Sequence, residues 1–367
     1  MKILALPNAL KGSLSARKAG QILERTLSAH HTVRVWPISD GGDGFLDFFQ
    51  TLDPHAKRIF ITAKNAFLKN KRTSFLLLSD RKTAIIETAK ICGLGNANPS
   101  ELNPLGASSY GIGQVLLAAA RCGAKTIYVG LGGVATNDGG AGMAMACGAY
   151  LSNKKGHSLP LGAEALLKIA CLDLQTLRKQ FRGIKIIGIC DVTNPLLGRL
   201  GSARVFGPQK GASPAQVIKL EHALKKWAQA LKQETGRDIA CLPSTGAAGA
   251  IAAGLCGCFG AELRLGASTL FKKARLQKQI QWADLIITCE GKLDEQTFYG
   301  KAPLAVLQLA YRAKKPVLFI CGQLDKKVLS RRRLLPTQLA VLADFSPTPQ
   351  DAKKHAARYM RRVCQHI

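Results

Sequence analysis

The chain has 367 residues, 47% of them hydrophobic and 20% charged, which is typical of a folded globular protein and long enough for two domains. Its 52 Lys and Arg against 23 Asp and Glu give a net charge of +29, and such a field attracts anionic ligands. Because the basic residues are spread along the chain and aromatic residues make up only 6% of it, we expect no specific nucleic-acid function; nonspecific association remains an alternative.

Short runs rich in β-branched residues alternate along most of the chain with Gly- or Asp-rich loops and helical patterns. In chain order, strands are predicted at residues 2–7, 33–38, 126–131, 185–190, 285–290, 316–321 and 338–343. This alternation is typical of α/β domains in which helices cover both faces of a parallel sheet. Residues 58–89 differ, because three strand-like runs follow one another without a helix, which predicts an antiparallel meander within a mixed sheet.

Two α/β domains account for both patterns. We predict a discontinuous, doubly wound domain with a parallel sheet, Rossmann- or flavodoxin-like, from residues 1–56 and 267–367. A second α/β domain, containing the mixed sheet, is predicted as an insertion over residues 57–266. Small-molecule sites commonly lie in clefts between domains, so we expect the active site there.

The stretch GLGGVATNDGGAG, residues 130–142, places six glycines between a predicted strand and a helical pattern over residues 141–151. Glycine inside an ordered element costs roughly 0.5–1 kcal/mol relative to alanine, so this backbone either bends sharply or closely approaches a ligand. Free amide groups at the start of a helix suit phosphate or carboxylate; a tight turn that only improves packing is the alternative. The stretch fits a dinucleotide fingerprint only loosely, and the chain has no P-loop sequence.

Four further segments have the same character: DGGDG (40–44), CDVTNPL (190–196), GPQKGAS (207–213) and CEGKLD (289–294). Each has the composition of an ordinary turn. Three of them follow predicted strands, however, and the carboxyl ends of strands line the ligand crevice of open α/β sheets. Together they offer carboxylates for a divalent cation, glycine amides for phosphate oxygens, and lysines for further negative charge. This set predicts phosphoryl transfer, whereas hydride transfer would not need so many carboxylates.

Eleven cysteines lie mostly in apolar runs, which is typical of buried free thiols in a reducing compartment. No Cys-x-x-Cys pair occurs. The apolar run before Pro7 is too short for a signal peptide. The uncharged segment 239–261 is rich in Gly, Ala and Ser, so it predicts a packed interior helix and not a membrane span. We therefore expect a cytoplasmic protein without a membrane partner.

A series of motifs in this chain strongly resembles the bacterial glycerate kinases that phosphorylate D-glycerate to 2-phosphoglycerate. In chain order the motifs are PNALKGSLSA (7–16), SDGGDG (39–44), GLGGVATNDGGAGM (130–143), CDVTNPLLG (190–198), VFGPQKGAS (205–213), TGAAGAIAAGL (245–255), GAELRLG (260–266) and ITCEGKLDEQTFYGKAP (287–303). The resemblance implies two α/β domains, ATP with Mg²⁺ as donor, and a small hydroxy acid, D-glycerate, as acceptor.

On this resemblance and the strand-end positions, Asp191 is the candidate base for the glycerate hydroxyl, and Lys11 and Asp138 complete the catalytic set. The candidate metal ligands are Asp40, Asp43, Glu290 and Asp294. The candidates for binding substrate or nucleotide are Asn8, Gly41, Gly42, Gly132, Gly133, Thr136, Asn137, Asn194, Lys210, Gly211 and Lys292.

Three positions depart from the family pattern. Asn8 stands where the family has Asp in a pattern like PDSFKGSLSA, Val134 replaces a serine, and Gln114 replaces a common glutamate. A neutral amide neither takes a proton nor contributes a full charge to Mg²⁺. If the family's Asp only caps a turn, however, Asn makes the same hydrogen bond and substitutes well. One alternative is therefore a glycerate- or nucleotide-binding protein without turnover. A kinase that gives 3-phosphoglycerate is another, because the two acceptor hydroxyls differ by only one carbon. The sequence does not determine the oligomeric state.

Overall fold

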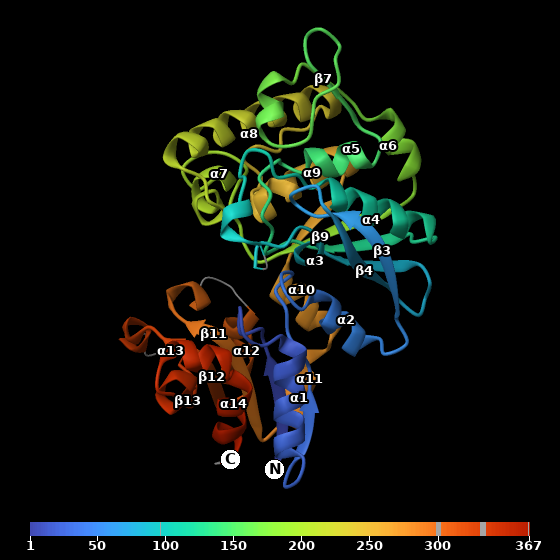
Figure 1. Ribbon diagram of the computed structural model, residues 1–367. Coiled ribbons are helices and arrows are strands. Elements are labelled where there is room, and N and C mark those ends of the chain that lie inside the picture. Colours follow the sequence, from blue (N-terminus) through green and yellow to red (C-terminus); the bar gives the residue numbers. More distant parts are fainter. Residues whose placement is uncertain (96, 299–301, 331–334, 366) are drawn as a thin grey trace. The chain divides into compact units, whose positions relative to one another are not determined.

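The computed structural model describes residues 1–95, 97–298, 302–330, 335–365 and 367, and its chain divides into two compact units (Figure 1). Met1–Pro54 and Leu265–Ile367 form the terminal unit, and His55–Arg264 form the inserted unit. The sequence placed these boundaries after residues 56 and 266. Each unit has its own sheet and its own apolar core.

A parallel sheet runs through the terminal unit in the strand order β13-β12-β11-β1-β2. Its strands are β1 (Lys2–Pro7), β2 (Thr32–Val35), β11 (Leu285–Leu293), β12 (Val317–Leu324) and β13 (Gln338–Val341). Ala5 of β1 pairs with Ile287 of β11, and Ile287 pairs with Leu318 of β12. The central strands are buried along most of their length, which explains their continuous apolar runs in the sequence.

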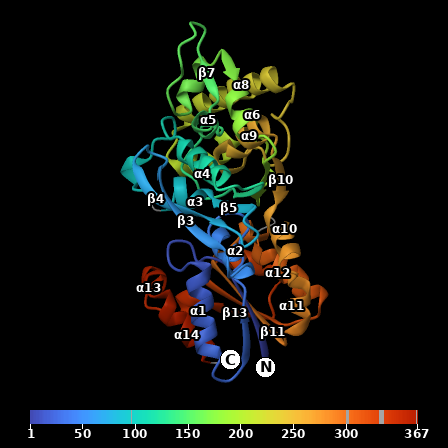
Figure 2. The ribbon, with the colours of Figure 1, turned by 90° about the vertical axis from the view of Figure 1, so that its right-hand side faces the viewer.

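Helices cover both faces of this sheet, as expected for a doubly wound domain (Figure 2). The helices of the terminal unit are α1 (Ala16–Leu27), α2 (Phe45–Leu52), α10 (Gly266–Lys273), α11 (Leu276–Trp282), α12 (Ala302–Arg312), α13 (Pro349–Lys354) and α14 (Ala356–Cys364). Helices α1 and α14 pack on the face that carries Ile3 and Ala5, and α11 and α12 lie on the other face. Helix α1 begins after Ser15, whose hydroxyl accepts a hydrogen bond from the Lys18 amide.

The inserted unit contains a mixed sheet in the order β10-β9-β6-β5-β4-β3, together with the hairpin β7-β8. The strands are β3 (Lys57–Lys64), β4 (Asn70–Leu77), β5 (Thr83–Glu87), β6 (Thr126–Gly130), β7 (Tyr150–Ser152), β8 (Cys171–Asp173), β9 (Lys185–Cys190) and β10 (Glu262–Leu265). Strands β3, β4 and β5 form the predicted antiparallel meander, while β5, β6 and β9 are parallel. The predicted mixed sheet and α/β fold class are thus confirmed.

The helices of the inserted unit are α3 (Thr88–Cys92), α4 (Tyr110–Arg121), α5 (Ala141–Ala146), α6 (Gln175–Gln180), α7 (Ser202–Phe206), α8 (Pro214–Thr235) and α9 (Ala247–Phe259). The helix predicted over residues 141–151 was too long, because α5 ends at Ala146 and the chain turns at Gly148 (φ +94°) into β7. Helix α9 is the packed interior helix expected from the uncharged segment, and nearly all of it is buried. No helix among the described residues has the length and apolar character to cross a membrane.

Short 3-10 helices connect these elements: η1 (Pro99–Glu101), η2 (Glu164–Lys168), η3 (Pro208–Lys210), η4 (Glu295–Phe298), η5 (Lys326–Ser330) and η6 (Leu342–Phe345). The eleven cysteines are free thiols, and most of them are buried.

Candidate active site

Three neighbouring parallel strands of the inserted unit end at one edge of its sheet. In the register, Glu87 of β5 pairs with Gly130 of β6, and Gly130 pairs with Ile189 of β9. The glycine-rich loop therefore starts beside the end of β5, and half-buried Asp191 follows the end of β9. In open α/β sheets ligands bind at the carboxyl ends of the strands, so this edge, which carries the candidate base, is a candidate ligand site.

Glu87 and Thr88 also lie at this edge, although neither was a candidate from its sequence pattern. Glu87 is only 2% exposed, and its carboxylate lies 3.8 Å from the ammonium group of Lys90. The Thr88 hydroxyl donates to the Gly130 carbonyl oxygen at 2.8 Å, which ties the first turn of α3 to the glycine-rich loop. Their position directly after a buried apolar run is the signal in the sequence, and Asp191 likewise follows a buried strand.

The interior part of the glycine-rich loop is organised around Asp138, which is 0% exposed. Its carboxylate accepts hydrogen bonds from the amide and hydroxyl groups of Ser109, at 2.8 and 2.9 Å, and from the amides of Gly140 and Gly142. Burial raises the pKa of Asp138, although these hydrogen bonds oppose the shift. The carboxylate thus joins the starts of α4 and α5 in the interior, whereas its sequence motif predicts a part in catalysis.

Lys210 is also buried, at 3% exposure, in η3. Its ammonium group donates a hydrogen bond of 2.6 Å to the carbonyl oxygen of Thr136. Burial lowers the pKa of Lys210 to about 7, and the charge of Asp138 opposes this shift. The side chain therefore holds the glycine-rich loop, and its neighbour Gly211 is exposed at φ +87°.

Helix α9 approaches the same loop through an unusual first turn. Ala248, Gly249 and Ala250 all have left-handed backbone angles. The Gly249 carbonyl accepts a hydrogen bond from the Gly139 amide, and a Cβ added at Gly249 would lie 1.8 Å from the Thr136 carbonyl oxygen. Only glycine permits this approach of two backbones.

Within the described part of the chain, the buried oxygens Oγ1 of Thr136 and Oδ1 of Asn137 have no hydrogen-bond partner. The Asn137 amide nitrogen donates to the Pro104 carbonyl at 3.4 Å. Buried polar atoms are normally paired with protein, water or ligand. Both residues were candidates from the sequence.

The loop after β9 is joined to the start of α9. The carbonyl oxygen of Asn194 accepts from the Gly246 amide at 2.9 Å, and that of Thr193 accepts from the Ser244 amide at 3.1 Å. The Asn194 side chain donates to the Leu200 carbonyl at 2.8 Å and so closes its own loop. The structure thus brings together three of the five selected segments, 130–142, 190–196 and 207–213, around the first turn of α9.

The other two segments, 40–44 and 289–294, lie in the terminal unit. In the same unit, Asn8 begins the loop that follows β1. Its side-chain oxygen accepts the Ala9 amide at 2.9 Å, which is a local turn contact. The loop then closes through paired backbone hydrogen bonds between Leu10 and Leu14, with Lys11 exposed near its tip. A Cβ added at Gly291 of β11 would lie 3.0 Å from the Lys11 amide nitrogen, so this loop rests on β11.

The last part of β11 contains Glu290 and Lys292, and Asp294 directly follows the strand. Glu290 is 8% exposed and accepts a hydrogen bond of 3.0 Å from the Thr297 hydroxyl. The ammonium group of Lys292, which is exposed, lies 3.8 Å from the Asp294 carboxylate. This end of β11 therefore presents both carboxylates and a cation.

The segment 40–44 forms the turn before α2. Asp40 accepts the Gly42 amide at 3.2 Å, Asp43 is exposed, and Gly41 has φ +107°. Across the residues that the structure describes, no group of three or more His, Cys, Asp or Glu side chains could hold a metal ion. The four expected metal ligands thus do not form one such cluster.

The remaining departures from the family pattern occupy structural positions. Val134 is 2% exposed, and its side chain belongs to the core of the inserted unit. The Gln114 side-chain oxygen accepts the Lys64 amide at 2.8 Å, which joins α4 to the end of β3. A glutamate could accept the same hydrogen bond, so Gln114 retains the contact without the charge.

Comparisons with known proteins agree with the motif series. A sequence model described as the glycerate kinase family matches residues 3–367. Glycerate 2-kinase of Escherichia coli (strain K12) is 36% identical over 332 residues, 89% of this chain and 87% of that protein. Glycerate kinase of Bacillus subtilis (strain 168) is 34% identical over 376 residues, covering 100% and 97%. A crystal structure assigned to a glycerate kinase 2 from Salmonella typhimurium LT2 superposes with a TM-score of 0.79 at 31% identity, covering 100% of this chain and 98% of that one.

Proposed function

The chain belongs to the glycerate kinase family, and from this premise we propose that it transfers the γ-phosphoryl group of ATP to the 2-hydroxyl of D-glycerate, giving 2-phosphoglycerate and ADP. The name of the Escherichia coli relative, a glycerate 2-kinase, supports the choice of the 2-hydroxyl. The free thiols of this chain favour a reducing compartment, which we propose to be the cytoplasm.

The observation that carries this proposal is the position of Asp191 directly after β9, at the edge where β5 and β6 also end. Its carboxylate accepts the proton of the glycerate 2-hydroxyl as that oxygen attacks the γ-phosphorus. The bond between the γ-phosphorus and the β–γ bridging oxygen breaks, and ADP leaves with that electron pair. Asp191 then releases the proton to solvent.

The anionic groups of both substrates need positive partners. Lys11 and Lys292 are exposed ammonium groups, and we assign them to the phosphates or to the glycerate carboxylate. Gly132 and Gly133 lie on the accessible part of the glycine-rich loop. We assign the Gly133 amide to phosphate oxygens, because the Gly132 amide donates to the Thr88 hydroxyl at 3.4 Å. Asp138 and Lys210 are assigned to positioning this loop, because both are buried.

Mg²⁺ fits the chemistry of the carboxylates in the terminal unit. The candidate ligands Asp40, Asp43, Glu290 and Asp294 offer the oxygen atoms that Mg²⁺ prefers, and in phosphoryl transfer this ion needs only one or two protein carboxylates besides phosphate oxygens and water. When bound, it would neutralise charge on the transferring phosphate. The absence of a three-residue cluster among the described residues is compatible with such a site.

The test is turnover of D-glycerate with ATP and Mg²⁺, followed by ADP release and by NMR of the product. In 2-phosphoglycerate the phosphorus couples to one methine proton, and in 3-phosphoglycerate it couples to two methylene protons. We expect ADP release and the methine coupling. Methylene coupling would show that the enzyme phosphorylates the 3-hydroxyl instead of the 2-hydroxyl. Ligand binding without ADP release would identify a binding protein that lacks turnover.

A further inference from the structure

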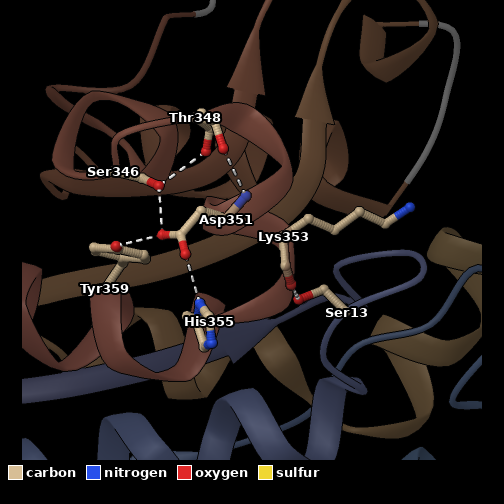
Figure 3. Close-up of polar contacts among 7 residues, drawn as sticks. All are labelled: Ser13, Ser346, Thr348, Asp351, Lys353, His355 and Tyr359. Atoms are coloured by element: carbon tan, nitrogen blue, oxygen red, sulfur yellow. Dashed lines mark hydrogen bonds and ion pairs between the residues drawn. The ribbon is translucent and has the colours of Figure 1, made fainter.

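Helix α13 of the terminal unit is held by a network around Asp351. One carboxylate oxygen accepts hydrogen bonds from the hydroxyl groups of Ser346, at 2.8 Å, and Tyr359, at 2.5 Å. The other oxygen lies 2.8 Å from Nδ1 of His355. Figure 3 shows these three side chains around Asp351. These hydrogen bonds, led by that of Tyr359, lower the pKa of Asp351 to about 2, so its carboxylate is ionised at neutral pH.

This network fixes the start of α13 against its neighbours. The Thr348 hydroxyl accepts the Asp351 amide at 3.1 Å and caps the helix, while Tyr359 belongs to α14. Tyr359 is itself buried in the core that α14 shares with α1. The Asp351 carboxylate therefore connects α13 to Tyr359 and so to the core of the terminal unit.

From α13 the contacts continue to the loop after β1. The Ser13 hydroxyl donates to the carbonyl oxygen of Lys353, which lies 340 positions later in the sequence (Figure 3). Gly12 has φ +73°, and a Cβ added there would lie 2.8 Å from Cε and 2.9 Å from Nζ of Lys353. The side chain of Lys353 thus lies directly against the tip of the loop.

The opposite side of this loop rests on β11. The Asn8 amide donates to the Cys289 carbonyl at 3.2 Å, and the Lys11 amide nitrogen faces Gly291. The loop 8–14 is therefore held between β11 and α13, and Lys11 lies between these two contacts.

We infer that Asp351, Lys353 and Ser13 are positioning residues, which hold the loop 8–14 so that Lys11 meets an anionic group of the substrates. This inference rests on the proposed function, in which Lys11 binds such a group. None of the three needs to touch a substrate. Their effect is expected on the geometry of the loop and, through it, on the Michaelis constants.

The experiment compares Ser13→Ala and Asp351→Ala with Ser330→Ala in the full chain. Ser330 is a matched control, because its hydroxyl also donates to a lysine carbonyl, that of Lys327, elsewhere in the terminal unit. Hydrogen exchange of the Ser13 and Leu14 amides is measured without substrate, and KM and kcat are measured for ATP and D-glycerate. We expect Ser13→Ala and Asp351→Ala to speed exchange about tenfold and to raise one KM severalfold with a smaller change in kcat. Ser330→Ala should change neither.

Exchange rates equal to those of the control would overturn the positioning role, and so would faster exchange with unchanged KM values. If the natural protein does not turn over glycerate, the proposed function fails, while the exchange arm still decides whether α13 holds the loop. Ser13→Ala removes one surface hydroxyl, so it keeps the test open if Asp351→Ala prevents folding. A double variant adds a steric check: Lys353→Ala should partly relieve the defect of Gly12→Ala, because it removes the atoms that the new Cβ would meet.

Discussion

The ammonium group of Lys210 donates a hydrogen bond of 2.6 Å to the carbonyl oxygen of Thr136, and both residues are buried in the inserted unit. A cation in this position connects η3 with the glycine-rich loop. Burial disfavours its charged form, and Asp138 compensates for only part of this effect, so its pKa is lowered to about 7. The geometry of the loop is thus maintained at an electrostatic cost that depends on pH.

We expect Lys210 to make the free energy of unfolding rise with pH between about 7 and 10.5. In this interval the unfolded chain keeps the lysine proton while the folded chain loses it, so higher pH favours the folded state; below pH 7 both states are protonated and the cost is constant. The full effect is on the order of a few kcal/mol. Urea unfolding at several pH values should show that Lys210→Met lacks this rise, whereas the exposed Lys232→Met keeps it. If the free energy of unfolding rose equally with pH in the natural protein and in Lys210→Met, the rise would not come from Lys210.

Gly249→Ala should destabilise the inserted unit far more than Gly236→Ala. Both glycines have left-handed angles, φ +62° and +72°, so each substitution costs about 1–2 kcal/mol for the backbone. Nothing lies within 4 Å of a Cβ at Gly236, but a Cβ at Gly249 would lie 1.8 Å from the Thr136 carbonyl oxygen. We expect this overlap to add about 1–3 kcal/mol or more. Chemical unfolding of the two variants measures the difference, and equal losses would show that the first turn of α9 moves freely away from Thr136.

The left-handed turn of α9 also shows where sequence patterns stop being informative. Runs of β-branched and other apolar residues predicted the strands, because a strand that is buried on both faces is apolar along most of its length. The uncharged segment 239–261 predicted a packed interior helix, and nothing local in Ala248 or Ala250 indicates positive φ angles. The close approach to Thr136, more than 100 residues earlier, sets this conformation, so only the tertiary structure reveals it.

The same limit applies to the charged residues of the site. A carboxylate beside glycines, such as Asp138, has the same local pattern whether it binds a ligand or caps a buried helix. The Ser109 groups that bind it lie 29 positions away in the sequence. Glu87 was missed because the run that contains it was interpreted as the last strand of a meander. Strand β5 also pairs in parallel with β6, so it ends at the same edge as the glycine-rich loop. Alternation alone does not specify this pairing.

Asn8→Asp should leave kcat within about threefold of the natural value. The Asn8 side-chain oxygen accepts the Ala9 amide, a contact that either residue makes, and this favours a turn role over a chemical one. Asn8→Ala removes the acceptor and is the informative partner variant, expected to weaken the turn. Steady-state ADP release with D-glycerate compares the three proteins. A large gain of activity in Asn8→Asp would mean that this position carries chemistry and that the natural chain is impaired.

Asp191→Asn should lower kcat on the order of 10²–10⁴-fold, because an amide at the end of β9 does not accept the proton of the attacking hydroxyl. The side chains are nearly equal in size, so dissociation constants for ATP and D-glycerate, measured by calorimetry, should change little. Asp238→Asn is the control, since this exposed carboxylate pairs only with Lys232 and the Ala240 amide among the described residues. A kcat close to that of the control would remove Asp191 from the role of base. Glu87, the other carboxylate at this edge, would then be the next residue to replace.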